Sequence, residues 1–185
     1  MMSEQAKSSI DQTKLHDLLF DVRRSVRYHN RRRLFYDRIC KGSDALTAIF
    51  GSATIITLLG STKVVPPETP MYMAGITAIL SVINLVFDTK ENARLHHDLA
   101  RDFITIEKNL IAPHLTPEKF AEAEARRLDI EAEEPPVLKV LDLTCHNDLL
   151  KAMGYEEEHY YKIGFWRSAF ANFFDLFPGS IKKAG

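Results

Sequence analysis

Two long apolar stretches without a charged residue lie near the middle of this 185-residue chain. The first runs from Ala45 to Thr62 and the second from Thr69 to Phe87, with 18 and 19 residues. As helices rising about 1.5 Å per residue, each is roughly 27 to 29 Å long, close to the apolar thickness of a bilayer. Buried helices of soluble proteins rarely stay uncharged over that length. The pattern therefore predicts two membrane-spanning helices.

The connector between the two runs, Lys63 to Glu68, has only six residues and contains Pro66 and Pro67. Such a segment does little more than turn the chain at one membrane face. We therefore expect an antiparallel helical hairpin with an external turn over residues 63–68.

Charge is confined to the flanks of the hairpin, although the whole chain has 26% charged residues and a net charge of -1. The cluster before the first run is strongly basic, whereas the connector carries only Lys63 against Glu68. By the positive-inside rule, both termini are expected in the cytosol. The basic residues, which are also candidates for lipid head-group contacts, are Arg23, Arg24, Arg27, Arg31, Arg32, Arg33, Arg38 and Lys41. The near-zero net charge gives no reason to expect a nucleic-acid partner.

The N-terminal residues do not indicate a cleaved signal peptide, and the cysteines do not indicate a disulfide framework. Residues 1–10 lack the apolar core of a signal peptide and are expected to be disordered. The two cysteines, Cys40 and Cys145, lie in no paired motif. Both fit reducing surroundings.

Long helices are predicted on both sides of the hairpin. Residues 11–44 contain no proline, and apolar residues at helical spacing (Leu15, Leu18, Leu19, Val22 and Val26) predict one amphipathic helix running into the first span. The second span is expected to continue without a break as a stalk over residues 88–112. Its apolar stripe is Leu95, Leu99, Phe103, Ile106 and Leu110. The two cytosolic helices should pack on each other.

The tail, residues 113–185, is predicted to be helical as well. Thr116-Pro117-Glu118 has the order of a helix start, and this helix should reach about Ile130. A second helix is expected from Val137 to Met153, with Gly154 at its end. A third, from Phe165 to Phe177, gathers aromatic side chains that either lie at the membrane interface or pack on the stalk. These are Phe165, Trp166, Phe170, Phe173, Phe174 and Phe177.

Small and hydroxyl-bearing residues recur in both apolar runs and admit two interpretations. They can pack the two helices closely within the hairpin, or face a water-filled path when several hairpins assemble. The candidates for packing or pore lining are Thr47, Gly51, Ser52, Thr54, Thr57, Thr77, Ser81 and Asn84.

We expect no catalytic site, metal or cofactor. His96 and His97 are neighbours on a helix and point about 100° apart, so they cannot share an ion and are expected to be surface residues. Cys145 and His146 are adjacent in the same way, which argues against a thiol nucleophile with a base. Asp142 and His146, four residues apart, should form an ordinary contact, with Asn147 tying its helix to a neighbour.

Part of this pattern resembles a known group of proteins. The motif Arg27-Tyr28-His29-Asn30-Arg31, the two spans, and Asn92-Ala93-Arg94-Leu95-His96 are similar to the SLATT group, bacterial two-span proteins linked to SMODS and SLOG nucleotide-signalling systems. The resemblance covers roughly residues 15–110. It implies a pore-forming effector of bacterial defence in the inner membrane, triggered by a cytosolic sensor protein or a nucleotide signal. The tail, with Cys145-His146-Asn147, looks like that of uncharacterised bacterial and phage hairpin proteins.

Taken together, the sequence predicts an all-α membrane protein whose two-span hairpin extends into a cytosolic helical bundle. Its partners are expected to be the lipid bilayer and further copies of itself. The predicted function is membrane perturbation or pore formation controlled by the bundle. The alternative is a non-conducting anchor or scaffold that recruits a protein partner.

Overall fold

The computed structural model describes residues 10–59, 66 and 68–184, and all the elements of this part of the chain are helical. The expected all-α class is confirmed. Of the segment predicted to be disordered, only Ile10 is among the described residues, and there the prediction was wrong, because Ile10 is buried in the core of the first unit. The end of the first apolar run and most of the connector also lie outside the described residues. The chain forms two compact units: Met1–Arg32 together with His96–Gly185, and Arg33–Leu95.

The longest element is α2, which runs from Gln12 to Leu59 without interruption. It begins where the carboxylate of Asp11 accepts a hydrogen bond of 2.9 Å from the backbone N–H of Thr13, an N-cap that satisfies one free donor of the first turn. The helix passes through Gly42 and belongs to both units. The prediction of one helix that enters the first apolar run is therefore confirmed.

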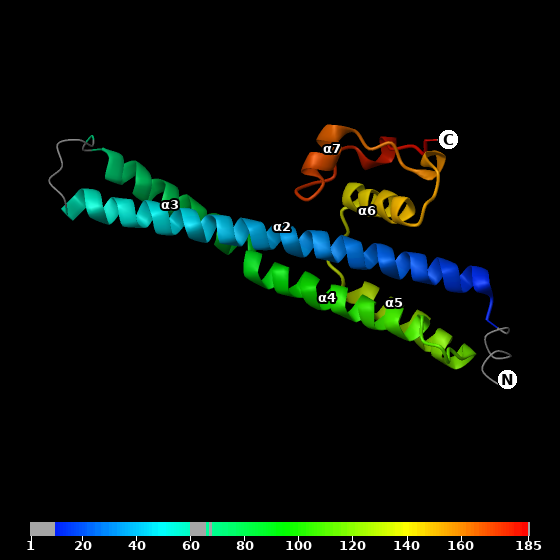
Figure 1. The fold of residues 1–185 in the computed structure, drawn as a ribbon. Coiled ribbons are helices and arrows are strands. Elements are labelled where there is room, and N and C mark those ends of the chain that lie inside the picture. The colour runs from blue at the N-terminus through cyan, green and yellow to red at the C-terminus, as the bar shows by residue number, and fades with distance from the viewer. Residues whose placement is uncertain (1–9, 60–65, 67, 185) are drawn as a thin grey trace. The chain divides into compact units, whose positions relative to one another are not determined.

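The first unit has a core built from α2, α4 (Thr89–Leu110) and α5 (Pro117–Glu133). Figure 1 shows α4 and α5 on one side of the N-terminal part of α2. Leu18 and Val22 of α2 are buried in this core with Phe103 of α4, so the predicted packing of the helices that flank the two apolar runs is confirmed. The start of α5 is also as predicted, because the Thr116 hydroxyl accepts a hydrogen bond of 3.4 Å from the Lys119 N–H.

The predicted stripe of α4 was wrong at one position. Leu95 is 39% exposed, whereas the neighbouring His96 is buried. Counting back from Phe103 by seven residues reaches His96, so the polar side chain, not the leucine, continues the buried face of the helix.

On the other side of α2, a second core holds α6 (Lys139–Ala152), with Val140, Leu141 and Cys145 buried against Tyr28. The end of α6 is a Schellman motif. Gly154 has φ +80, its N–H bonds the Lys151 carbonyl, and the N–H of Tyr155 bonds the Leu150 carbonyl. The start of α6 is capped from a distant segment: the Asp175 carboxylate accepts hydrogen bonds of 2.9 Å from the N–H groups of residues 139 and 140.

The segment after α6 is less helical than predicted. A short 3₁₀ turn, η1 (Glu157–His159), comes first, followed by α7 (Phe165–Phe170) and a second turn, η2 (Pro178–Ser180). The expected aromatic helix therefore ends at Phe170 instead of Phe177. Phe177 has φ +48, a left-handed conformation that a helix cannot contain.

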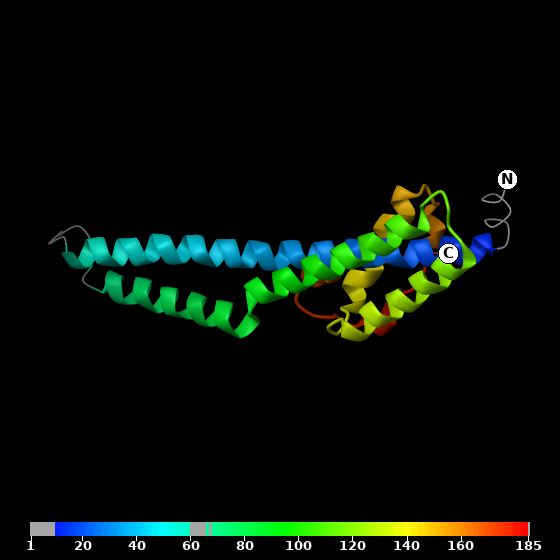
Figure 2. The ribbon, with the colours of Figure 1, turned by 90° about the horizontal axis from the view of Figure 1, so that it is seen from below.

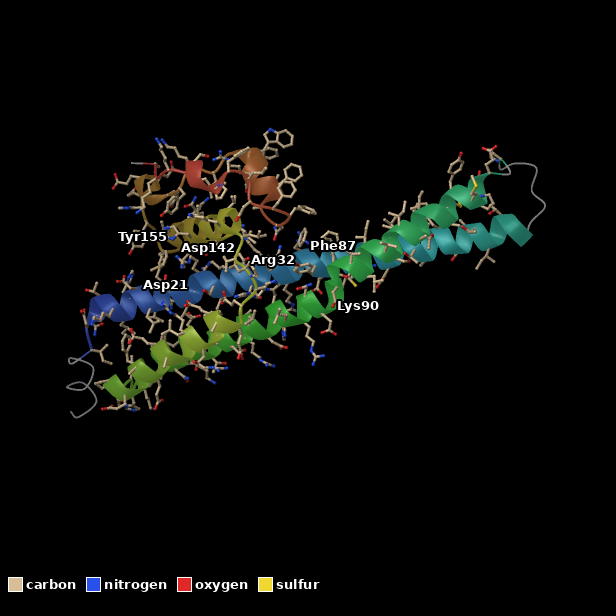
Figure 3. The ribbon with its side chains drawn as sticks, turned by 180° about the vertical axis from the view of Figure 1, so that it is seen from behind. Asp21, Arg32, Phe87, Lys90, Asp142 and Tyr155 are labelled. Atoms are coloured by element: carbon tan, nitrogen blue, oxygen red, sulfur yellow. The ribbon has the colours of Figure 1, made fainter. Side chains whose placement is uncertain are left out.

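The second unit pairs the C-terminal part of α2 with α3 (Thr69–Phe87), which lie side by side in Figures 1 and 2. The prediction that the second apolar helix continues unbroken into the stalk was wrong. Asp88 adopts a left-handed conformation with φ 42 and ends α3 before α4 begins. Figure 3 labels Phe87 and Lys90 on the two sides of this break.

Candidate functional site

The most apolar element of the chain is α3. Within the stretch Thr69–Leu110 an 18-residue window has a mean hydropathy of 1.7, and none of that window is buried. It is the one helix among the described residues that is long and apolar enough to cross a membrane. Large side chains such as Ile79 and Leu85 are 61% and 80% exposed. The crossing of the first apolar run stays a prediction, because that run ends outside the described residues.

The hydroxyl-bearing residues of the hairpin fall on two faces. Four of them, together with Gly51 and Asn84, are partly buried, whereas Ser52 and Ser81 are exposed; the four are Thr47, Thr54, Thr57 and Thr77. A Cβ added at Gly51 would meet nothing within 4 Å, so this glycine does not serve close packing inside the unit.

Hydrogen bonds of these hydroxyls stay within their own helices. Ser52 donates to the carbonyl of Ala48 at 2.7 Å, and Ser81 donates to that of Thr77 at 2.9 Å. The hydroxyls of Thr54, Thr57 and Thr77 bond carbonyls four residues earlier in the same way. Such back-bonding satisfies the hydroxyl proton without water or a second helix. Asn84 accepts a bond of 3.2 Å from Thr89 across the break between α3 and α4.

The break itself is held by a side chain from the next turn. The amide nitrogen of Asn92 donates to the carbonyls of Phe87 at 2.9 Å and Asp88 at 3.3 Å. The Phe87 carbonyl is one that the end of α3 leaves without a helical partner, whereas the Asp88 carbonyl also accepts a bond of 3.0 Å from the backbone N–H of Asn92. Lys90 also lies 3.6 Å from the carboxylate of Asp44 on α2. Side-chain contacts therefore fix the geometry at which the apolar helix ends.

Much of the basic cluster is occupied by contacts inside the protein. Arg23 pairs with Glu107 at 2.7 Å, Arg31 pairs with Asp148, and Arg32 donates to the carbonyl of Asn172 at 2.6 Å. In sequence the cluster had only Asp21 and Asp37 nearby, so these distant partners could not be foreseen. Arg24, Arg27 and Arg33 also have contacts, with Asp21, the Arg23 carbonyl and Asp37, whereas Arg38 and Lys41 are exposed.

A buried histidine pair joins α2 to α4 in the first unit. Nδ1 of His29 lies 2.9 Å from Nδ1 of His96, and both side chains are 1% exposed. Nε2 of His29 lies 3.1 Å from the carboxylate of Glu134, and its ring stacks on Phe103 at 5.6 Å. Burial lowers the pKa of His96 to about 3, with the nearby His29 as the second cause. The expectation of a surface pair at His96 and His97 was therefore wrong for His96.

Sequence reasoning missed this pair, although a signal for it was present. The helical spacing of Leu15, Leu18, Val22 and Val26 leads to His29, and the spacing of α4 leads to His96. Two histidines that continue apolar stripes of helices expected to pack together are candidates for a buried contact.

Beside His29 lies a cavity of about 290 Å³ that is lined by Tyr28, Arg24, Glu134 and Asp142 among other residues. Burial raises the pKa of Asp142, and it also raises the pKa of Tyr28. Nε of Arg24 lies 3.2 Å from Asp142, yet this N–H is not aligned for a hydrogen bond, so we treat the contact as an ion pair by proximity. The carboxylates of Asp142 and Asp21, two residues that Figure 3 labels, lie 3.2 and 3.3 Å from nitrogen atoms of Arg24. Carboxylates outnumber cations here, which disfavours a phosphate ligand.

The Cys145 segment is structural in its contacts. The thiol is fully buried, and burial raises its pKa to about 12, which removes thiolate character at neutral pH. The ring of His146 packs edge-on against Phe20 and Tyr161, and the contact of Asp142 is with Arg24, so the expected Asp142–His146 contact was wrong. Asn147 does tie α6 to a neighbour as predicted: its amide exchanges two hydrogen bonds of 2.8 Å with the backbone of Tyr161.

The described residues contain no group of three or more histidine, cysteine or acidic side chains that could hold a metal ion. Comparisons of the chain with protein-family models, with curated proteins and with solved structures found no match.

Proposed function

We propose that this protein inserts the two apolar helices of its hairpin into the inner membrane of a bacterium, with both termini in the cytosol. There, several copies act as a pore-forming or membrane-perturbing effector controlled by the helical bundle. The observation that carries the proposal is the surface of α3: its 18-residue apolar window is entirely unburied, while the first unit has complete cores of its own. An apolar surface of that length is unfavourable in water and favourable in lipid.

The geometry at the end of α3 supports control by the bundle. The side chain of Asn92 bonds the last turn of α3, and that of Thr89 bonds Asn84. Lys90 pairs with Asp44. A movement of α4 would therefore either move the end of α3 with it or break these polar contacts. Discrete rearrangements of this kind are a common basis for switching.

The proposal also rests on assembly. Ser52 and Ser81 are exposed, and Gly51 and Gly75 have open space where a Cβ would be, so each apolar helix presents small residues that the hairpin does not cover. In membranes, such surfaces allow close approach of further helices. The resemblance to the two-span effectors described above agrees with this role.

The test is dye release from liposomes that contain the purified full-length chain. We expect release that rises steeply with protein-to-lipid ratio, because several copies are needed for each lesion. The matched control is the same chain with Ile79→Asp, which should integrate poorly and release little dye. Full integration of the unchanged chain as an oligomer, without release at any ratio and with no effect of candidate nucleotides or cell extract, would refute a pore.

The second candidate function is a non-conducting anchor or scaffold. It is favoured by the back-bonded hydroxyls of the hairpin, which satisfy their protons within their own helices and require no water-filled path. Crosslinking in membranes separates the two functions. A ladder of homo-oligomers supports the effector, whereas monomers linked to one other protein support the scaffold.

A further inference from the structure

Aromatic side chains form an exposed surface in the last part of the first unit. We call the following six residues, with their exposed fractions, the aromatic surface: Phe165 77%, Trp166 70%, Phe170 38%, Phe173 57%, Phe174 50% and Phe177 76%. Trp166 stacks on Phe170 at 6.3 Å between ring centroids, and Phe170 stacks on Phe174 at 5.7 Å. With the contacts of Phe165 to Trp166 and of Phe170 to Phe173, five of the six rings, all but that of Phe177, form one connected group. Contiguous apolar patches on proteins usually mark a site of contact.

The backbone that carries these rings is fixed to the rest of the unit. Between the aromatic positions, Ala171 is 1% exposed and belongs to the second core. The carbonyl of Asn172 accepts the hydrogen bond from Arg32, and the carboxylate of Asp175 caps α6. The residues of the segment that face inward are thus bonded or buried, and the aromatic ones face outward.

The segment of chain that carries the aromatic surface is basic in sequence. Between residues 160 and 184 the basic residues are Lys162, Arg167, Lys182 and Lys183, and the only acidic residue is Asp175. The Asp175 carboxylate is already engaged by the N–H groups at the start of α6. The acidic run Glu156–Glu158 precedes this range. Exposed tryptophan and phenylalanine with lysine and arginine nearby form the usual composition of a surface that lies in the head-group layer of an anionic membrane.

We propose that the aromatic surface binds an anionic lipid surface, with Trp166 and the phenylalanine rings inserted at the boundary between head groups and acyl chains. This gives the protein a second lipid contact, made by the bundle and separate from α3. The inference rests on the proposed function in one respect, namely that the chain works at a membrane. Burial of the aromatic rings and the attraction between the lysines and anionic lipid are both needed for this binding.

Trp166 is the single tryptophan of the chain, so its fluorescence reports on this surface alone. The experiment uses the full-length protein in liposomes of phosphatidylcholine with and without phosphatidylglycerol. With phosphatidylglycerol present we expect a blue-shifted emission, quenching by brominated lipid and a several-fold loss of quenching by acrylamide. The double variant Lys182→Glu/Lys183→Glu should reverse these changes, whereas Lys119→Glu on the exposed part of α5 should leave them in place.

Extraction of the same liposomes with alkaline carbonate measures the insertion of the hairpin independently. Trp166 that stays open to acrylamide in a chain resistant to extraction overturns this inference and leaves the proposed function standing. If brominated lipid quenches Trp166 in a chain that alkaline carbonate extracts, this inference stands and the proposed insertion of the hairpin is overturned. Protection of Trp166 from acrylamide without quenching by brominated lipid would mean that protein covers the aromatic surface, which also overturns the inference.

Discussion

Nε2 of His29 lies 3.1 Å from the Glu134 carboxylate and its Nδ1 lies 2.9 Å from Nδ1 of His96, so the two rings and the carboxylate form one chain of polar contacts inside the first unit. In the neutral form in which Nε2 of His29 donates to the carboxylate, Nδ1 of His29 is the acceptor and Nδ1 of His96 carries the proton. Adding a proton to both rings would place two N–H groups face to face. The contact between α2 and α4 therefore requires that at least one of these rings stays neutral.

The first prediction concerns the stability of the first unit below neutral pH. The pKa of His96 is about 3 in the folded protein, below the usual value of about 6.5 in an unfolded chain. Between these values the unfolded state binds the extra proton, so the contribution of His96 to stability is present above pH 6.5 and is lost as pH falls. Well below pH 6.5 the free energy of unfolding should decrease by about 1.4 kcal/mol per pH unit for this one proton.

Unfolding of the full chain in detergent, followed by circular dichroism from about pH 7.5 to about pH 4.5, measures this slope. The range begins about one unit above the pKa of the unfolded state and ends above the pKa of about 3 of the folded state. His96→Gln should make the slope shallower by about one proton. The control is His97→Gln, because His97 is mostly exposed and contacts Asp98. Equal slopes for the two variants would mean that burial of His96 is not the cause.

The second prediction concerns insertion of α3. Ile79 lies in the middle of this helix and is 61% exposed. An aspartate at the centre of a spanning helix costs about 2.5 to 3.5 kcal/mol, so Ile79→Asp should shift most of the chain to the fraction extracted by alkaline carbonate. Leu128→Asp is the matched control, since Leu128 is equally exposed at 59% but lies on α5. The control chain should stay in the membrane fraction; its loss from that fraction would speak against a specific role of α3.

The third prediction concerns the cap that Asp175 provides to α6. Asp175→Ala leaves two N–H groups of α6 without their partner and should lower the free energy of unfolding by about 1 to 2 kcal/mol. Chemical denaturation of the first unit measures the loss. Asp129→Ala, at an exposed position of α5, should change stability by less than about 0.5 kcal/mol. Because Asp175 also holds the aromatic surface, Trp166 emission should broaden in the first variant only.

The fourth prediction concerns the left-handed residue between α3 and α4. Glycine adopts φ +42 freely, whereas a β-branched side chain is strained there. Asp88→Gly should therefore be tolerated, while Asp88→Val should lower stability by roughly 1 to 2 kcal/mol. The two substitutions are compared by thermal melting in the same detergent. If valine is as well tolerated as glycine, the break between the helices is not at this residue in solution.

The fifth prediction concerns the two thiols. Cys145 is fully buried with a pKa of about 12, and Cys40 is 8% exposed beside the carboxylate of Asp44. Maleimide at neutral pH should label neither thiol of the folded chain within minutes and both after denaturation. Rapid labelling of Cys145 in the folded protein, confirmed by mass spectrometry of the peptide and absent from Cys145→Ser, would revive a nucleophilic role.

Sequence periodicity predicted the helices well wherever a long apolar stripe or a clear cap was present. The unbroken α2, the Thr116 cap of α5 and the Gly154 ending of α6 are of this kind. These features depend on residues that are close in sequence, and local spacing is enough to identify them.

Contacts between distant segments were the part that sequence could not supply. Asp88 is not a helix breaker by type, and its left-handed conformation depends on Asn92 and the end of α3. In the same way, Asp175 gave no sign that it caps a helix more than thirty residues earlier. Leu95 and His96 are neighbours on α4 and point about 100° apart. The predicted stripe was placed through the apolar Leu95, and nothing in the local sequence shows that His96 is the buried residue instead.

The break at Asp88 has a consequence for how this chain can vary. In one continuous helix, inserting a residue turns everything beyond it by about 100°, so a lipid-facing stripe and a core-facing stripe must keep a common phase. Here a single left-handed residue separates the two stripes, so the exposed apolar face of α3 and the buried face of α4 need not follow one helical phase. Homologues that share the break should therefore vary the apolar face of α3 while keeping the buried stripe of α4.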